Sequence, residues 1–272
     1  MGTWGVGLYQ DDITCDIQDE YLDWLRIGKT NEEATSIILA DGEEYGDDEE
    51  YAAIIIALAD TQWKKGRLLP EIKEKALEYI KNGTELKRWQ EEPKLFEKRK
   101  KVLEKVAERL NLPQPPEKKL APLRLKKRLY PGGNIILYKL QAPEFKNTKW
   151  YGSYVSLKVI GFYKLYIGSL PRDKYYHIED VVKIHNFHGK NKPSAEEINN
   201  NKMHNYEFTE FVLSLNKREV KKLNLELVKK ATSTDKDEDF TNSSKSFINI
   251  NNIEYILIGD LMCYEKDQNI EL

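Results

Sequence analysis

The sequence predicts an α+β protein, with an all-helical N-terminal domain followed by a β-rich domain that is an SH3-like or partly open barrel or a strongly bent sheet. Apolar residues recur at helical spacing through residues 1–111, whereas later segments are rich in Val, Ile, Tyr and Phe and partly alternate. Between them, LPQPPEKKLAP favours an extended chain. We therefore place an acidic helical domain at residues 1–112, a Pro/Lys-rich linker at 113–129 and the β-rich domain at 130–272.

The first helix is expected over residues 9–28. Asp11 or Asp12 can cap it, because a short carboxylate accepts hydrogen bonds from the free N–H groups of a first turn. Gly28 ends it. Its apolar stripe consists of Ile13, Ile17, Tyr21, Trp24 and Leu25.

Two further helices follow in the first domain. Thr30 and Glu33 form a capping-box pattern for a helix that extends through Leu39. The next helix covers residues 47–65 and ends at Gly66. Its segment YAAIIIALADTQW is apolar on most sides, which predicts that it lies at the centre of the domain.

The rest of the first domain is also predicted to be helical. Pro70 suits the first turn of a helix that Gly83 terminates. A short helix is expected near residues 86–90, and a long one over 94–111. The inward residues of the long helix are predicted to be Leu95, Val102, Leu103, Val106 and Leu110.

The second domain is predicted to consist mainly of strands joined by Gly, Asn and Lys turns. A short helix should begin within residues 193–197, and the polar segment 232–246 is predicted to be a mobile loop. The expected strands lie in IILYKL, YVSLKVIGFYKLYI, YHIEDVVKIHNF, YEFTEFVLSL, LNLELVKK and IEYILIGDLMCY.

Charge is unevenly distributed along the chain. Residues 1–62 carry 16 acidic and 2 basic side chains, while residues 63–128 carry 10 acidic and 21 basic ones. The first block repels nucleic acid and membranes, and the second can attract either. Cys15 and Cys263 are too few for a disulfide framework. The N-terminus has no secretory-signal pattern, and no apolar run is long enough to span a bilayer, so we expect a cytoplasmic protein without a membrane partner.

The acidic residues after the N-terminal glycines allow two interpretations. Asp11, Asp12 and Asp16 could supply carboxylate oxygens to a divalent cation, and Asp12 and Asp16 would share a helix face. Alternatively, they cap the helix and form a solvated acidic face, which is favourable near a helix N-terminus. The second interpretation is the simpler one, and we expect no cofactor.

Trp4, Gly5 and Gly7 are assigned a structural role. No strand precedes these glycines and no GK[ST] sequence follows them, so they do not form a phosphate-binding loop. We expect them to provide backbone turns that seat Trp4 on the helices.

Asp60 and Trp63 are likewise expected to be structural. Asp60 ends a buried apolar run, so its carboxylate must find a partner, for which Lys64 or Arg67 is available. A catalytic carboxylate at this position is the alternative.

The histidines are weak evidence for a metal. On a strand, His185 and His188 would point to opposite faces, and neither an HExxH pattern nor a cysteine partner accompanies them. All four histidines fall in the second domain: His177, His185, His188 and His204.

Two charged stretches could contact macromolecules. The basic residues 98–101, 118–119 and 126–128 are a candidate nucleic-acid footprint on the helix 94–111 and the linker, although acids alternate along this helix. The acidic block 41–50 could dock on a basic partner. A solvated surface without a partner explains either stretch equally well.

The opening MGTWGVGLYQDDITCDIQDEYLDWL, the later ALADTQWKKGRLLPEIKEKAL, the segment Leu86–Trp89 and the linker resemble an uncharacterised bacterial family, a domain of unknown function. The similarity covers roughly residues 1–120, with several motifs in the same order. It implies that the chain is related to this family, to which no activity is assigned.

The second half resembles the small β-rich domains of immunity proteins from bacterial polymorphic-toxin systems. The similarity lies in Pro131-Gly132-Gly133-Asn134 before a strand and in Trp150-Tyr151-Gly152-x-Tyr154 before another. Where those proteins usually have Gly-Asp-Val-Phe, this chain has Gly133-Asn134-Ile135-Ile136. The resemblance implies a non-catalytic protein that binds a toxin or a phage-related partner.

The expected function is therefore toxin neutralisation or phage defence through protein–protein interaction. An acidic surface would steer a basic partner, and Trp150, Tyr151 and Tyr154 would anchor it. One alternative is a divalent-metal-dependent enzyme or effector acting on nucleic acid. Another is a nucleic-acid-binding regulator, whose binding would fall steeply with salt.

Overall fold

The computed structural model describes residues 2–45, 47–200, 209–248 and 252–268. The chain forms two compact units, and the helical and β-rich halves confirm the α+β class. The helical unit comprises residues 1–124 and 168–172, and the β-rich unit comprises 125–167 and 173–272. The boundary at Arg124 lies inside the segment predicted to be a linker.

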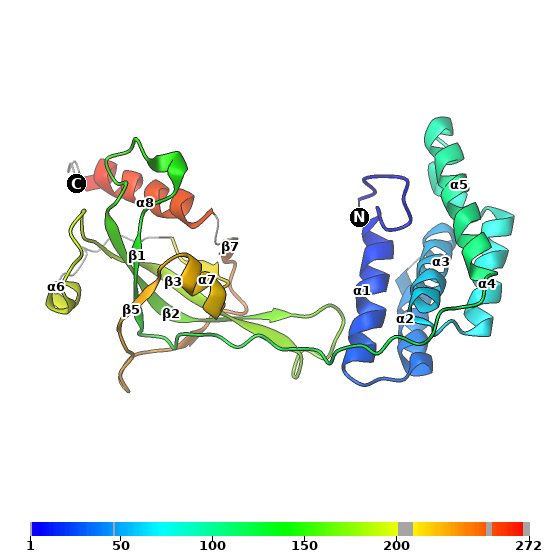
Figure 1. Cartoon of the computed structure of the whole chain (residues 1–272), viewed down its shortest axis with the longest axis horizontal. Coiled ribbons are helices and arrows are strands. Elements are labelled where there is room, and N and C mark those ends of the chain that lie inside the picture. Colours follow the sequence, from blue (N-terminus) through cyan, green and yellow to red (C-terminus); the bar gives the residue numbers. More distant parts are fainter. Residues whose placement is uncertain (1, 46, 201–208, 249–251, 269–272) are drawn as a thin grey trace. The chain divides into compact units, whose positions relative to one another are not determined.

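Six helical elements build the N-terminal unit (Figure 1). The expected helix starts and the buried central helix are confirmed, while the second helix continues six residues beyond its expected end at Leu39. The elements are α1 (Asp12–Arg26), α2 (Asn31–Tyr45), α3 (Asp48–Lys65), α4 (Pro70–Asn82), the 3₁₀ helix η1 (Glu85–Trp89) and α5 (Pro93–Leu110).

Local capping explains where these helices begin and end. The Asp11 carboxylate caps α1 by accepting from the Ile13 N–H at 3.0 Å. Thr30 and Glu33 form the reciprocal capping box. Gly66 and Gly83 end α3 and α4 with left-handed backbones.

The proline-rich segment is attached to the helical unit. The Leu68 N–H donates to Gln114 Oε1 at 2.8 Å, and the Lys118 N–H donates to the Lys65 carbonyl at 2.9 Å. Gly66 is needed here, because an added Cβ would lie 2.3 Å from the Pro115 carbonyl oxygen. We call residues 113–124 the strap.

The β-rich unit contains an open sheet with the order β5-β1-β2-β3-β4-β7, and β6 pairs in parallel with β2. The described strands contain no ladder between β5 and β7, so the described part of the sheet is open between its two edge strands. The strands are β1 (Ile135–Lys139), β2 (Tyr154–Tyr166), β3 (Tyr176–Phe187), β4 (Phe211–Leu213), β5 (Glu226–Lys229), β6 (Glu238–Asp239) and β7 (Ser246–Ile248).

Helices complete this unit, and a long one occupies a segment that was expected to be a strand. The strand predicted over residues 253–264 is wrong: α8 (Ile253–Gln268) occupies it (Figure 1). Its buried residues Ile253, Leu257 and Leu261 recur every four positions, which is helical spacing. The remaining helices are short: η2 (Pro143–Phe145), α6 (Ala195–Asn200) and α7 (Lys217–Lys222). Helix α6 confirms the helix start expected within residues 193–197.

The segment predicted to be a mobile loop is held by specific contacts. Asp237 pairs with Arg128 at 2.7 Å and accepts from the Gly132 N–H at 3.0 Å. Gly133 has a φ of 93°, and an added Cβ would lie 2.3 Å from Asp235 Cβ. The segment therefore packs against the start of β1. No helix in the described parts of the chain is long and apolar enough to cross a membrane.

Candidate functional site

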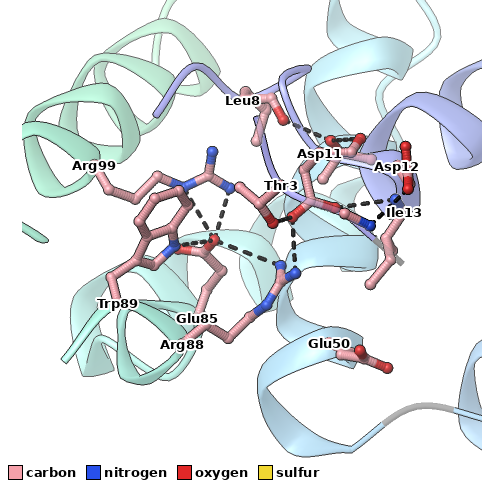
Figure 2. Close-up of polar contacts among 12 residues, drawn as sticks. Thr3, Leu8, Asp11, Asp12, Ile13, Glu50, Glu85, Arg88, Trp89 and Arg99 are labelled. Atoms are coloured by element: carbon pink, nitrogen blue, oxygen red, sulfur yellow. Dashed lines mark hydrogen bonds and ion pairs between the residues drawn. The ribbon is translucent and has the colours of Figure 1, made fainter. Parts of the chain in front are cut away.

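The predicted acidic site lies inside a network of ion pairs and hydrogen bonds (Figure 2). The Asp11 carboxylate is 1% exposed and caps α1. It also accepts from Thr3 Oγ1 at 2.9 Å and pairs with Arg88 Nη2 at 2.7 Å. Asp11 thus ties the N-terminal segment, α1 and η1 together.

The network continues from η1 into α5. Glu85 and Arg99 are fully buried, and Arg99 donates to Glu85 Oε1 through Nε at 3.0 Å and Nη2 at 2.6 Å. Arg99 Nη1 also donates to the Gly7 carbonyl at 2.8 Å. Its guanidinium lies 5.4 Å from the ring centroid of Trp89. Arg99, which sequence reasoning treated as part of a basic surface, therefore anchors the N-terminal loop.

The three candidate metal ligands have separate environments. Asp12 accepts from the Gly2 N–H at 2.6 Å, whereas Asp16 is exposed on the next turn of α1. Asp11 is occupied by Arg88, as described above. Among the described residues, no group of three or more His, Cys, Asp or Glu side chains could hold a metal ion. The structure therefore gives the metal hypothesis no assembled site.

The N-terminal glycines have a structural role, but their turns do not seat Trp4, whose side chain is 60% exposed. That expectation was wrong. An added Cβ at Gly5 would lie 2.3 Å from Gln10 Oε1, and one at Gly7 would lie 3.0 Å from it. The glycines make room for Gln10 instead.

A second buried carboxylate, Asp60, is surrounded by polar partners. It accepts from Tyr9 Oη at 2.8 Å and pairs with Lys64 at 2.7 Å and with Arg109. Lys64 was a predicted partner, whereas Arg67 pairs with Glu117. Burial and the neighbouring Asp60 charge raise the pKa of Tyr9.

The remaining predicted structural residue, Trp63, stands beside this cluster. Its Nε1 donates to the Leu112 carbonyl at 3.3 Å, and Arg109 lies 6.0 Å from its ring centroid. Tyr9 and Arg109 were missed, because nothing in the sequence shows that α1's leading loop and the end of α5 meet at α3. The Asp60 cluster joins these three segments.

Part of the predicted basic footprint is used inside the β-rich unit. Lys126 Nζ lies 2.7 Å from Glu179, and Arg128 pairs with Asp180 at 3.1 Å as well as with Asp237. Burial raises the pKa of Asp180 to about 6, against the lowering effect of Arg128. Lys126 and Arg128 are therefore not free cations, which removes them from the predicted footprint, whereas Lys127 is exposed.

The predicted aromatic anchors are poorly placed to contact a partner. Trp150 is 8% exposed and belongs to the core of the β-rich unit, while Tyr151 and Tyr154 are half-buried. Among the described residues of the β-rich unit, the most exposed large apolar side chains lie on α8, where Tyr255 is 56% and Met262 is 54% exposed.

Two histidines converge instead of pointing to opposite faces. Ser156 Oγ lies 3.2 Å from His185 Nδ1 and 2.9 Å from His188 Nε2. A bulge explains the error: Ser156 pairs with Asn186 and Leu157 with Ile184, which leaves His185 as the extra residue.

The environment of these histidines opposes protonation. Burial, Lys158, His188 and Lys229 lower the pKa of His185 to about 4, and burial lowers that of His188. His177 Nδ1 accepts from the Lys126 N–H at 2.9 Å, while His204 lies outside the described residues. Both shifts favour the uncharged form of the two imidazoles at the end of β3.

Comparison with known proteins found no matching family model, no matching curated protein and no matching solved structure. The two resemblances drawn from sequence motifs therefore stand as expectations.

Proposed function

We propose that the protein is a non-catalytic bacterial binding protein of the immunity type, which acts in the cytoplasm by covering a basic toxin or phage component. The observation that carries the proposal is the acidic face of α1. Asp12, Asp16, Asp19 and Asp23 are spaced four, three and four residues apart, so they follow one side of the helix.

The charge of this face is only partly compensated within the chain. Among the described residues, Asp11 and Asp23 of this segment form ion pairs. Asp16 and Asp19 are exposed. Burial and the charges of Asp12 and Asp19 raise the pKa of Asp16, which indicates like-charge repulsion at this face. A basic partner would relieve that repulsion and would be steered towards it.

The other carboxylates of the helical unit support the same division of roles. Asp11, Asp60 and Glu85 are buried and paired with cations of the chain, so their charges are compensated within the fold. Breaking such a pair leaves an uncompensated buried charge. The exposed face of α1 is therefore better suited to a partner than these buried groups are.

The test compares two charge-reversal variants in the native host. Asp16→Lys/Asp19→Lys reverses the proposed face, and Glu71→Lys/Glu78→Lys reverses two exposed acids on one side of α4. We expect the wild type and the α4 variant to capture the same basic protein stoichiometrically and to suppress its toxicity on co-expression. The α1 variant should lose both effects.

The salt dependence of binding to the purified partner supplies an independent criterion, because exposed charges are screened by salt. The association rate of the wild type should fall as salt is added. Equal capture and protection by both variants would refute the proposed face, and a captured protein whose toxicity is unaffected would refute the immunity-type function.

One observation favours a second candidate, a nucleic-acid-binding regulator. Lys94, Lys98, Lys101 and Lys105 follow one side of α5 and are exposed, and none has an ion pair with the described residues. Duplex binding through these lysines should weaken with salt, with a log–log slope of up to about −3.6 for four phosphate contacts. No duplex binding at low salt would exclude this candidate.

A further inference from the structure

The sheet of the β-rich unit carries a row of lysines on the side that faces away from its core. Lys158 of β2 is paired directly with Lys183 of β3, whereas the next residue, Val159, belongs to the core. Ile135 of β1 pairs with Lys158 on one side and with Lys229 of β5 on the other. Like charges that lie directly opposite each other destabilise a sheet, so this arrangement is unfavourable unless an anion lies nearby.

The charges of Lys158 and Lys229 are only partly compensated. Among the described residues, neither side chain forms an ion pair. Both act through space on the Asp235 carboxyl, whose pKa is lowered mainly by hydrogen bonds from the N–H and Oγ1 of Thr232, at 2.8 Å each. Burial lowers the pKa of His185, and the charges of Lys158 and Lys229 lower it further. This face of the sheet therefore has a positive potential.

A pocket of about 360 Å³ lies beside these lysines. Its apolar wall consists of Ile160 and Phe240, and its cations are Lys158, Lys183 and Lys236. Small-molecule sites usually measure about 300–1,000 Å³, so this pocket can accommodate a small ligand. Three carboxylates also line it: Glu210, Asp235 and Glu238.

The segment that forms one wall of the pocket is fixed to the sheet. Glu238 pairs in parallel with Gly161 of β2, and an added Cβ at Gly161 would lie 2.1 Å from the Glu238 carbonyl oxygen. Asp237 pairs with Arg128 at 2.7 Å and accepts from the Gly132 N–H at 3.0 Å. The wall is therefore preformed, which reduces the entropy that a ligand must overcome on binding.

The carboxylates of the pocket do not cancel its positive charge. Glu210 pairs with Lys245 and lies 4.0 Å from Lys183. Asp235 accepts hydrogen bonds from its own segment, and Glu238 is exposed. The described lysines that act here outnumber these three carboxylates by two: Lys158, Lys183, Lys229, Lys236 and Lys245.

We propose that this pocket binds phosphate, as the free ion or as the phosphate group of a small organic molecule, through Lys158, Lys183 and Lys236. Directly paired strand residues have Cβ atoms about 4.5–5.5 Å apart, so both sheet ammonium groups can reach one phosphate. A phosphate monoester carries a charge of about −1.5 to −2 at neutral pH, which matches the excess of two lysines. Ile160 and Phe240 provide an apolar surface for the rest of an organic ligand. The inference is independent of the proposed immunity-type function, because it needs no protein partner.

Titration of the ¹⁵N-labelled full chain with inorganic phosphate tests the proposal by NMR, with sodium chloride holding the ionic strength constant. The amides of Lys158, Lys183 and Lys236 should shift saturably, with a dissociation constant of about 1 mM. Lys158→Gln/Lys183→Gln should weaken binding at least about tenfold. Lys217→Gln/Lys221→Gln, which removes two exposed lysines of α7, is the matched control and should bind like the wild type.

Adenosine monophosphate distinguishes an organic phosphate from the free ion. Tighter binding than that of inorganic phosphate, with the difference removed by Phe240→Leu, would show that the apolar wall contributes and that the ligand is an organic phosphate. Equal affinities would identify the free ion as the ligand. Either result supports phosphate binding and names its source.

Stability supplies a second criterion. Without ligand, Lys158→Gln/Lys183→Gln should not melt at a lower temperature than the wild type, because two opposed like charges are removed. Phosphate should raise the melting temperature of the wild type but not that of this variant. Lys236→Gln leaves the sheet intact and should weaken binding about threefold, so it decides the question if the sheet variant does not fold. No saturable shift in the wild type, or wild-type affinity in the folded pocket variants, would overturn the proposal.

Discussion

Buried carboxylates in the helical unit and the buried Glu254 of the β-rich unit are satisfied in different ways. In the helical unit, Glu85 and Asp60 are balanced by cations from other helices. In the β-rich unit, the 2% exposed Glu254 accepts from Tyr138 Oη at 2.5 Å and from the Gln141 and Ala142 N–H groups at 2.7 and 2.9 Å. Cations compensate Glu85 and Asp60, whereas neutral donors satisfy Glu254. The other buried carboxylates of the β-rich unit, Glu179 and Asp180, pair with Lys126 and Arg128 and so follow the first pattern.

The largest effect should follow from removing a buried cation. Arg99→Met leaves Glu85 buried and unpaired, and should lower the unfolding free energy of the helical unit by about 3–5 kcal/mol. Urea denaturation followed by circular dichroism measures it. Glu85→Gln/Arg99→Met should recover much of the loss, and Lys29→Met, in an exposed pair with Glu33, should change stability by less than about 1 kcal/mol. A loss of that small size in Arg99→Met would refute the structural role of the network.

The strap should be the next most sensitive feature of the helical unit. Gly66 and Gly83 share a φ of 69°, so alanine at either strains the backbone by about 1–2 kcal/mol. Only Gly66→Ala also meets the strap, at the Pro115 carbonyl. Its larger destabilisation should be accompanied by faster hydrogen exchange of the Lys118 amide. Equal effects at both glycines would show that the strap contact is unimportant.

The Glu254 site should respond more mildly to the loss of its charge. Glu254→Gln replaces one carboxylate oxygen by a donor that faces other donors, and should destabilise this unit by about 1–3 kcal/mol. Tyr138→Phe, which removes one of the hydrogen bonds, should remove about 1 kcal/mol in the same urea titration. If Glu254→Gln were as damaging as Arg99→Met, the contrast between the Glu254 and Glu85 sites would fail.

The smallest expected effect is a pH dependence of the β-rich unit. The pKa of His185 falls from 6.5 to about 4 on folding, so between these values the unfolded chain binds more protons and stability rises with pH. The raised pKa of Asp180 acts in the opposite direction between 3.8 and about 6. His185→Gln should remove the rising contribution, so that the change in stability from pH 4 to pH 6.5 is lower than in the wild type by about 1 kcal/mol, after discounting for solvent screening. Identical pH profiles for the wild type and His185→Gln would contradict the assignment.

The two units also differ in how much of them the sequence predicts. Caps at Asp11, Thr30 and Gly66 are local signals, so the starts of the helices follow from neighbouring residues. The bulge at His185 depends on pairing between distant segments, which no local pattern contains. Short apolar runs such as that of α8 suit a strand or a helix, and there the helical spacing was overlooked.

The candidate site was less predictable than the fold. Asp11, Asp12 and Asp16 were identified from one motif, but their separate roles depend on Arg88 and Gly2, which reach them from other segments. Arg99 was missed because a charged residue within a basic run suggests an exposed position. Its spacing from Leu103 and Val106 nevertheless places it on the buried side of α5. Trp150 was misassigned because its burial depends on the whole core of the β-rich unit.

The central claim is that exposed acids of α1 bind a partner while the buried acids hold the fold. The most direct measurement is capture from the native host by Asp16→Lys/Asp19→Lys. It is made at a temperature at which melting curves show that this variant and the wild type are both folded. The account predicts a folded protein that no longer retains the basic partner held by Glu71→Lys/Glu78→Lys. Retention of that partner at wild-type yield would contradict it.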